Sequence, residues 1–436
     1  MSERRKVQVF KFGGAALQDA EGFRNVLHLL KPYRGQPLVI VISALGKTTN
    51  ALEQVVEAYF HDPVEALHRL QALKKQHELI ALQLFDASDP VIDKLHNTFA
   101  EAEWLLEEHR REPYDYVYDQ VVAVGELASS LLVARLLEVN GLETRWLDVR
   151  DLIITDDSFR EANVHWPETI QRITNNISTS INPPWIVTQG FIAATSGNRT
   201  TTLGREGSDY SAAIFAHALD ATSVTIWKDV PGVLNADPRL VPNAIPIRQL
   251  SYHEAIEMSY YGATVIHPKT IKPLQNKSIP LYVRSFVDAE LPGTVINHEQ
   301  TEVLPPIVVL KNRQVLLSIY PRDFSFITEA ALSEIFSLLS NHRMRTHLMQ
   351  QSAMSFSLCT DENERLEALL TDLRRSFAVR ENRNLHLLTI RHYTEPLLAQ
   401  LLKNAAIYLE QKSRHTVQIA LQPPQMWPAL KNLKFP

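Results

Sequence analysis

A lysine and two glycines occur together near the start of the chain, in the segment Lys11-Phe12-Gly13-Gly14. Two consecutive glycines allow backbone N–H groups to approach an anion closely, and the neighbouring lysine can neutralise phosphate charge. For these four residues alone, a plain turn with a surface lysine explains the pattern equally well. The segment is therefore a candidate phosphate contact that needs support from elsewhere in the chain.

A second loop, Ser43–Asn50, is rich in hydroxyl groups and contains the Gly-Lys-Thr of a P-loop. The P-loop pattern also needs a glycine five residues before Gly46, and that position holds Val41. A P-loop is therefore not predicted. Ser43 and Thr49 can still donate hydrogen bonds to a carboxylate or a phosphate.

An acidic residue, Glu126, follows Gly125 at the predicted start of a helix that runs to Val139. A helix dipole stabilises a carboxylate at its N-terminus, so a simple N-terminal charge is one interpretation. The other is a fixed anion that receives an ammonium group. The sequence around Glu126 leaves both open.

The segment TTTLGREGSDYSAA at 200–213 is the most informative part of the chain. Its small and polar residues lead to Ser208 or Asp209 as the predicted cap of a helix over 212–219. Free N–H groups at such a helix start bind anions, and the planar guanidinium of Arg205 matches a carboxylate. We therefore predict an anion-binding site here in preference to an ordinary surface loop.

Two further segments place charges beside predicted strand or helix ends. Lys228 and Asp229 follow a buried strand, and a Pro-Gly turn then leads to Arg239, which suits a nucleotide pocket at the carboxyl end of a sheet. Lys269 follows Pro268 at a loop–helix junction, where a lone lysine is normally a solvated surface residue. The histidines lack the i, i+4 pairing of a zinc helix, and we predict no metal site made wholly of protein.

The elements that position these residues alternate between strands and helices. Short, apolar runs rich in β-branched residues predict strands at 7–12, 38–43, 144–148, 185–189, 223–227 and 281–285. Helix-length segments separate several of them, and the stretch from about 64 to 120 predicts long helices. This alternation predicts an α/β fold, a three-layer αβα sandwich with a mainly parallel sheet.

The composition of the chain changes near Leu304-Pro305-Pro306, and no glycine occurs beyond Gly293. Loops that wrap phosphates need glycine, so this region is poorly suited to nucleotide chemistry. It predicts paired α+β modules, with strands or helices at 315–320, 327–339, 346–350, 354–359, 363–377, 385–390, 397–404, 407–411 and 416–421. We therefore predict one domain over 1–300, a second region over 304–436, and a loose proline-rich segment from 423 onward.

The composition excludes several classes of protein. The 436 residues are 45% apolar and 21% charged, an ordinary globular mixture for two or three domains. A formal charge of −5 disfavours a nucleic-acid partner, and one cysteine, Cys359, excludes an intramolecular disulfide. Apolar runs fall short of the roughly 20 residues of a membrane span, and the N-terminus lacks a signal-peptide pattern. We expect a soluble cytoplasmic protein without a membrane partner.

Taken together and in this order, the segments resemble the aspartate kinase family of the amino-acid kinase superfamily. The resemblance extends over about 7–296 and rests on KFGG at 11–14, SALGKTTN at 43–50, GE at 125–126, TTTLGREGSDYSAA at 200–213, KDVPGVLNADPR at 228–239 and GATVIHPKT at 262–270. The region over 304–436 resembles a divergent pair of ferredoxin-like ACT regulatory modules. We expect a monofunctional enzyme without a homoserine dehydrogenase half.

The resemblance implies transfer of the γ-phosphoryl group of ATP, with Mg²⁺, to the side-chain carboxylate of L-aspartate. The product would be 4-phospho-L-aspartate, at the first step of lysine, threonine and methionine biosynthesis. A carboxylate nucleophile with a pKa of about 4 needs no general base, so catalysis would rest on positioning and charge neutralisation. The resemblance also implies a homodimer through 304–436 and feedback inhibition, commonly by lysine or threonine.

The resemblance assigns roles to individual residues as well. The catalytic residues would be Lys11 and Asp209. Glu126 would bind the substrate ammonium and Arg205 the α-carboxylate, and the substrate-binding set would be Ser43, Thr49, Glu126, Arg205 and Ser208. The nucleotide would contact Lys11, Gly13, Gly14, Lys228, Asp229, Arg239 and Lys269.

Three departures from the family pattern keep alternatives open. Ala15 and Ala16 replace hydroxyl residues, Glu206 adds negative charge near the phosphates, and Lys228 is unusual before Val-Pro-Gly. One alternative is a kinase for glutamate or N-acetylglutamate, although paired Glu126 and Arg205 favour a free amino acid. The other is a non-catalytic amino-acid sensor that retains the kinase fold.

Overall fold

The computed structural model describes residues 7–108, 112–177, 185–263, 266–299, 303–323, 325–403, 405–422, 430–431, 433 and 435. The chain divides into two compact units. The first comprises Met1–Val233, Arg248–Ile256 and Val265–Thr301, and the second comprises Leu234–Ile247, Glu257–Thr264 and Glu302–Pro436. Two short segments from the predicted first domain thus belong to the second unit. Most of the predicted loose segment, from 423 onward, lies outside the described residues, but Leu430 and Leu433 within it are buried in a core of the second unit, so these two positions are not loose.

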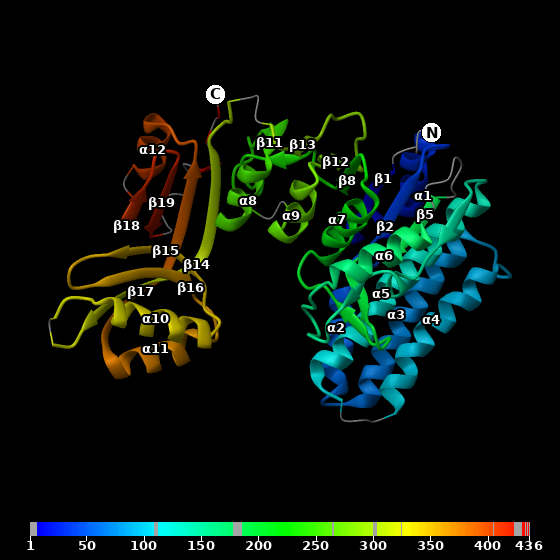
Figure 1. Cartoon of the computed structure of the whole chain (residues 1–436), viewed down its shortest axis with the longest axis horizontal. Coiled ribbons are helices and arrows are strands. Elements are labelled where there is room, and N and C mark those ends of the chain that lie inside the picture. Colours follow the sequence, from blue (N-terminus) through cyan, green and yellow to red (C-terminus); the bar gives the residue numbers. More distant parts are fainter. Residues whose placement is uncertain are drawn as a thin grey trace. The chain divides into compact units, whose positions relative to one another are not determined.

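The first unit is built on an eight-stranded sheet with the order β11-β13-β12-β8-β1-β2-β5-β3 (Figure 1). Its strands are β1 (Gln8–Phe12), β2 (Leu38–Ile42), β3 (Thr144–Trp146), β5 (Trp185–Gln189), β8 (Ser223–Lys228), β11 (Gln249–Ser251), β12 (Leu281–Ser285) and β13 (Thr294–Asn297). The pairings described are parallel except that between β12 and β13. The mainly parallel sheet predicted from the apolar runs is therefore confirmed.

Helices cover both faces of this sheet. One core contains Phe10 and Phe12 of β1 and Ile40 of β2, together with residues of the first five helices. Helix α7 packs on strands β1, β2 and β8, and α6 and α9 lie beside it. The helices of this unit are α1 (Ala20–Leu30), α2 (Thr48–Tyr59), α3 (Pro63–Leu84), α4 (Pro90–Glu107), α5 (Tyr114–Val139), α6 (Trp166–Asn176), α7 (Gly207–Leu219) and α9 (Pro268–Asn276). Short 3-10 helices are η1 (Gly14–Leu17), η2 (Lys31–Tyr33) and η3 (Val149–Asp151).

Helix α5 is the central helix of the first unit. Within the described part of the chain, it alone has the length and hydropathy that could span a membrane, but 83% of its apolar window is buried inside the structure. That burial is typical of a core helix. The helix also begins twelve residues before Glu126, and this difference changes the interpretation of that residue below.

Several smaller elements complete the fold. A three-stranded sheet, β4 (Ile154–Thr155), β6 (Ile192–Thr195) and β7 (Thr200–Thr202), has the order β4-β6-β7. A two-stranded sheet is formed by β9 (Val233–Leu234) and β10 (Pro246–Ile247), and α8 spans Tyr252–Tyr261. Because β7 pairs only with β6 in its sheet, its other edge needs partners from elsewhere.

The second unit contains a six-stranded antiparallel sheet with the order β15-β16-β14-β17-β19-β18. Its elements are β14 (Ile307–Pro321), α10 (Glu329–Asn341), β15 (Thr346–Gln351), β16 (Phe356–Asp361), α11 (Leu366–Ser376), β17 (Phe377–Arg391), α12 (Glu395–Leu402), β18 (Ile407–Lys412) and β19 (Thr416–Leu421). The predicted order of elements is present. The two predicted modules, however, share one sheet, because β14 and β17 are each 15 residues long and pair with each other along their length.

Candidate active site

Three neighbouring parallel strands bring the first candidate residues to one edge of the sheet. Lys11 lies near the end of β1, Ser43 directly follows β2, and Lys228 ends β8. Strands β2 and β8 pair with β1 on either side. Because the carboxyl ends of parallel strands meet at the same edge, the side chains after these strands surround one space.

A cavity of about 590 Å³ opens at this edge, within the first unit. Four carboxylates and four cationic groups line it, which suits a ligand that carries charges of both signs. The lining residues are Lys11, Gly14, Ser43, Ala44, Gly46, Thr49, Glu53, Tyr118, Glu126, Arg160, Phe191, Gly204, Arg205, Glu206, Gly207, Ser208, Asp209 and Lys228.

Lys11 and Asp209 form a buried ion pair on the cavity wall. Lys11 Nζ lies 2.7 Å from Asp209 Oδ1, and Lys228 Nζ lies 3.7 Å from Asp209 Oδ2. Burial by itself would raise the pKa of the Asp209 carboxyl, but the two lysines outweigh it and hold this pKa below its usual value. Asp209 is therefore an anion at neutral pH that fixes two ammonium groups at the cavity.

The paired glycines allow two loops to touch. A Cβ on Gly14 would lie 2.5 Å from the carbonyl oxygen of Gly46 and 2.7 Å from that of Ala44. The Gly46 N–H also donates to the Gly14 carbonyl at 3.1 Å. Gly13 precedes η1, and its Cβ would lie 3.3 Å from Lys11 Nζ. Glycine is needed here because the loops after β1 and β2 are in backbone contact.

Glu126 lies in the middle of α5, so the prediction that it opens a helix was wrong. Gly125 suggested a helix boundary, but it instead allows close packing: a Cβ there would lie 3.0 Å from Ala44 Cβ and 3.1 Å from Thr48 Cγ2. The helix dipole therefore does not account for the Glu126 carboxylate, because that effect is confined to the terminal turn.

The Glu126 side chain is 2% exposed, and its Oε2 has no hydrogen-bond partner among the described residues. Thr49 Oγ1 lies 3.5 Å from its Oε1. Burial raises the pKa of Glu126 to about 8. A buried carboxyl of this kind favours a cationic partner, because a positive charge beside it would offset the loss of hydration.

The helix that follows the Arg205 loop starts earlier than predicted. Glu206, with φ 55°, occupies the cap position, so Ser208 and Asp209 lie in the first turn of α7 instead of capping it. The residue before the helix is left-handed and makes no side-chain cap bond, a pattern that sequence rules for caps do not anticipate. Arg205 is exposed and lines the cavity.

Four predicted nucleotide contacts, Gly13, Asp229, Arg239 and Lys269, are not among the residues that line the cavity. Asp229 is exposed after β8. Lys269, in the first turn of α9, forms a 2.5 Å ion pair with Glu161. Arg239 belongs to the second unit and pairs with Asp237 at 2.7 Å. The nucleotide roles of all seven predicted residues, including the three that line the cavity, stay predictions.

The sequence motifs missed several lining residues. Tyr118 Oη donates to Glu53 Oε1 at 2.7 Å, and the Arg160 guanidinium lies 4.5 Å from the centre of the Tyr118 ring. Glu53 is four residues from Thr49 on α2, and Tyr118 is eight residues from Glu126 on α5, so each pair shares a helix face. That signal exists only once the helix boundaries are known, because Glu53, Tyr118 and Arg160 lie outside the glycine-rich motifs.

Three non-glycine residues with positive φ line the same cavity. Their φ angles are 68° at Arg160, 70° at Phe191 and 55° at Glu206. Such conformations cost on the order of 1–3 kcal/mol each and cluster at functional sites. Close packing surrounds Phe191, since a Cβ on Gly207 would lie 2.7 Å from Phe191 Cδ2. No cluster of three or more His, Cys, Asp or Glu that could hold a metal occurs within the described ranges.

Residues 6–285 match the amino acid kinase family. Lysine-sensitive aspartokinase 3 of Escherichia coli is 31% identical over 82% of this chain and 78% of that protein. Bifunctional aspartokinase/homoserine dehydrogenase 2 of Arabidopsis thaliana is 36% identical over 66% of this chain, but the match spans only 32% of the plant protein. The chain therefore belongs to the amino acid kinase family and, within it, to the aspartate kinases.

Solved structures agree with this assignment. Aspartokinase III of Escherichia coli, in complex with aspartate and ADP (R-state), superposes with a TM-score of 0.84 at 26% identity, covering 98% of both chains. The same enzyme in complex with lysine and aspartate (T-state) gives a TM-score of 0.81 at 27% identity. The α/β fold and the family expected from the motifs are thus confirmed.

Proposed function

We propose that the chain transfers the γ-phosphoryl group of ATP to the side-chain carboxylate of L-aspartate. The observation that carries this proposal is the buried Glu126, which shares one cavity with Arg205 and with the Lys11–Asp209 ion pair. The related aspartokinase III of Escherichia coli was solved with aspartate and ADP together, which supports the choice of both ligands.

The charges of the cavity match those of a free amino acid. Glu126 binds the α-ammonium group, and the guanidinium of Arg205 binds the α-carboxylate. Ser43, Thr49 and Ser208 line the same cavity and can donate hydrogen bonds. An N-acylated amino acid has no ammonium group and would leave the buried Glu126 carboxyl without a partner, so N-acetylglutamate fits this cavity less well.

The reaction needs charge neutralisation more than proton transfer. One oxygen of the ionised aspartate side chain forms a bond to the γ-phosphorus, the bond from that phosphorus to the bridging oxygen breaks, and ADP leaves. Lys11 offsets the negative charge shared by the acceptor and the nucleotide. Asp209 holds the ammonium group of Lys11 in place through the 2.7 Å ion pair, so this charge is positioned before substrates bind.

Mg²⁺ fits this cavity as an ion that enters with the nucleotide. Protein-bound Mg²⁺ commonly uses one or two carboxylates together with substrate phosphates. Glu206 lines the cavity, and its Oε2 has no hydrogen-bond partner among the described residues, so its carboxylate is suited to this role. When bound, the ion would neutralise phosphate charge.

Trapping of the acyl phosphate with hydroxylamine tests the proposed activity. With Mg-ATP, the chain should form the hydroxamate from L-aspartate, and much less from L-glutamate or N-acetylglutamate. Absence of product from aspartate would overturn the proposal. If aspartate still stabilised the chain against thermal unfolding in that case, the result would favour the non-catalytic amino-acid sensor.

We also propose that the second unit is an ACT-like regulatory region through which two chains form a homodimer. The relative in Escherichia coli is named lysine-sensitive and was also solved with lysine, which supports a regulatory role. Large apolar side chains of this unit are exposed, at Phe326, Phe336, Met349, Met354, Ile407 and Tyr408.

The product would enter lysine, threonine and methionine biosynthesis in the cytoplasm. Steady-state rates with millimolar lysine or threonine would test the regulation.

A further inference from the structure

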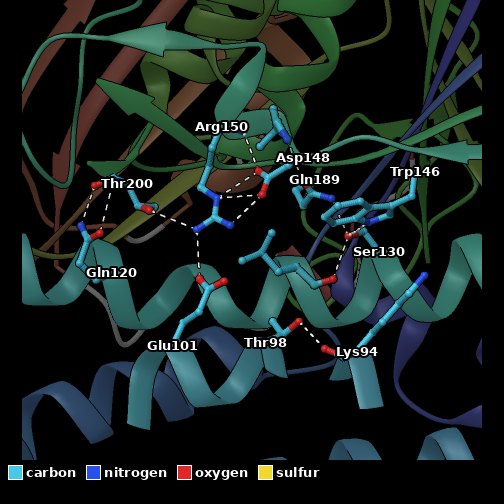
Figure 2. Close-up of polar contacts among 12 residues, drawn as sticks. Lys94, Thr98, Glu101, Gln120, Ser130, Trp146, Asp148, Arg150, Gln189 and Thr200 are labelled. Carbon is cyan, nitrogen blue, oxygen red and sulfur yellow. Dashed lines mark hydrogen bonds and ion pairs between the residues drawn. The ribbon is translucent and has the colours of Figure 1, made fainter. Parts of the chain in front are cut away.

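The outer edge of strand β7 is bound by side chains instead of by another strand. Gln120 of α5 accepts a hydrogen bond from the Thr200 N–H at 3.3 Å and donates to the Thr200 carbonyl at 2.8 Å (Figure 2). Two residues further along β7, the carboxylate of Asp119 accepts from the Thr202 N–H at 2.9 Å and from Thr202 Oγ1 at 2.8 Å. Neighbouring residues of α5 thus replace the missing strand.

Asp119 also binds a second wall of the cavity. Its Oδ2 accepts from the Arg160 N–H at 2.9 Å, and this bond helps to hold the left-handed backbone of Arg160. The Ala162 N–H in turn donates to the Thr202 carbonyl at 2.9 Å. One carboxylate therefore joins α5, the turn at Arg160 and the end of β7. Asp119 is completely buried, and its carboxylate accepts three hydrogen bonds from groups of the chain itself. Substrate binding therefore does not explain these bonds.

The position of Asp119 along the chain gives these bonds a specific consequence. Asp119 is seven residues, or two helical turns, before Glu126, so both side chains lie on one face of α5. Thr202 is three residues before Arg205. Asp119 consequently connects the helix that carries the ammonium receptor to the loop that carries the α-carboxylate receptor.

Additional contacts fix α5 three turns further along the helix. Ser130 of α5 accepts hydrogen bonds from Gln189 Nε2 at 2.7 Å and from Trp146 Nε1 at 3.0 Å, as Figure 2 shows. Gln189 also accepts from the Val149 N–H at 2.7 Å. With the helix anchored in this way, the Asp119 contacts set the position of the loop relative to the helix.

We propose that Asp119 is a positioning residue for the phosphoryl acceptor, because it fixes the Arg205 loop and the Arg160 turn relative to Glu126. The inference rests on the proposed function and concerns the amino-acid half of the site. It assigns to Asp119 no contact with the substrate. Loss of its bonds should therefore weaken aspartate binding while ATP binding persists.

The test compares two substitutions at this position in the full chain. Asp119→Ala removes all three hydrogen bonds and should raise KM for aspartate about tenfold or more, with KM for ATP changed less than about twofold. Asp119→Asn should restore most of the affinity, because its amide oxygen can accept from the two N–H groups while its NH₂ donates to the Thr202 hydroxyl. A purely structural role would lower thermal stability without separating the two KM values.

A matched control is available one turn earlier on the same helix. Asp115 forms a solvent-exposed ion pair with the Arg160 guanidinium at 3.3 Å, and such pairs contribute little, whereas Asp119 binds the backbone of that turn. Asp115→Ala should therefore leave both KM values nearly unchanged. If Asp119→Ala does not fold, Thr202→Val decides, because it removes one bond to Asp119 and should raise KM for aspartate about threefold. Unchanged KM for aspartate in the folded variant tested would overturn the inference alone. Failure of the wild-type chain to phosphorylate aspartate would overturn the proposed function itself.

Discussion

The Lys11–Asp209 ion pair joins residues almost two hundred positions apart, and its surroundings decide what each contributes. Asp209 also lies 3.7 Å from Lys228, so removal of Lys11 would not leave an isolated buried anion. This arrangement separates the catalytic role of Lys11 from its role in stability, since an uncompensated buried charge is usually what makes such a substitution unfold a protein.

Lys11→Met should therefore lower kcat by about 10²–10³ while the chain stays folded. The reason is the loss of one preorganised positive charge beside the transferring phosphoryl group. Steady-state kinetics together with circular dichroism would measure both effects. Lys47→Met, a substitution in a neighbouring loop at a position that does not line the cavity, serves as the control. Retention of most of the wild-type kcat would remove Lys11 from the catalytic role.

Glu126 predicts a pH dependence of aspartate binding. Burial raises its pKa to about 8 in the free chain, whereas the substrate ammonium needs the ionised form. Below pH 8 the ionised fraction falls with decreasing pH, so KM for aspartate should rise, by up to about tenfold per pH unit. In Glu126→Gln this dependence should disappear and KM for aspartate should be high at every pH, with KM for ATP nearly unchanged.

The same raised pKa fixes the sign of a stability effect. Between the usual glutamate pKa and about 8, the folded chain holds a proton that the unfolded chain has lost. The free energy of unfolding contributed by Glu126 therefore decreases as pH rises through this range and is lost above it. Glu126→Gln should be less sensitive to this pH change in thermal unfolding. An equal decrease in both proteins would contradict the raised pKa.

At the scale of elements, the loops after β1 and β2 depend on glycine. A methyl group on Gly14 would meet two backbone carbonyl oxygens, which cannot move aside as a flexible side chain could. Gly14→Ala should lower the free energy of unfolding by about 1–3 kcal/mol and also reduce activity, because the loops would separate. Thermal or urea unfolding would measure this loss.

Gly197 provides the matched control for that substitution. It lies in the turn between β6 and β7, and the nearest atom to an added Cβ would be Thr195 Oγ1 at 3.7 Å, an ordinary contact. Gly197→Ala should therefore change stability by only a few tenths of a kcal/mol. Equal effects of the two substitutions would mean that backbone contact between the loops is not the cause.

At the scale of the whole molecule, the apolar side chains of the second unit bear on the proposed dimer. Apolar residues recur along α10 as a stripe, but this stripe is used at least partly within its own unit, because Ile335 and Leu339 are buried in a core with Leu358 and Phe377. The stripe therefore does not by itself require a second chain. The support lies instead in the exposed apolar side chains of this unit named above.

Sedimentation equilibrium of the full chain should give twice the chain mass of 49.6 kDa. The full chain is the right material, because removal of everything after 300 would break bonds inside the second unit. Asn235 Nδ2 donates to the Pro306 carbonyl at 3.0 Å, and Arg391 pairs with Glu257 at 2.8 Å. A monomer at micromolar concentration would contradict the proposed homodimer.

The sequence by itself determined the local features of this protein. Alternating apolar runs and helix-length segments predicted the parallel sheet, because burial on both faces leaves a strong pattern in each strand. The glycine-rich and charged motifs, taken in order, predicted the family. In the described structure, Lys11, Ser43, Thr49, Arg205 and Asp209 also line one cavity. These signals are local, so they can be recognised without knowledge of what packs against them.

The tertiary structure decided which groups face one another and what packing does to their chemistry. Gly125 was expected to mark the start of a helix, but it lies inside α5 and allows close packing. Burial in the folded chain raises the pKa of Glu126. The role inferred for Asp119 depends on an edge of β7 that no pattern in the chain reveals. Likewise, β14 and β17 are continuous because they pair with each other across both predicted modules. Burial and long-range pairing arise from segments distant in sequence, so they are fixed only when the chain is folded.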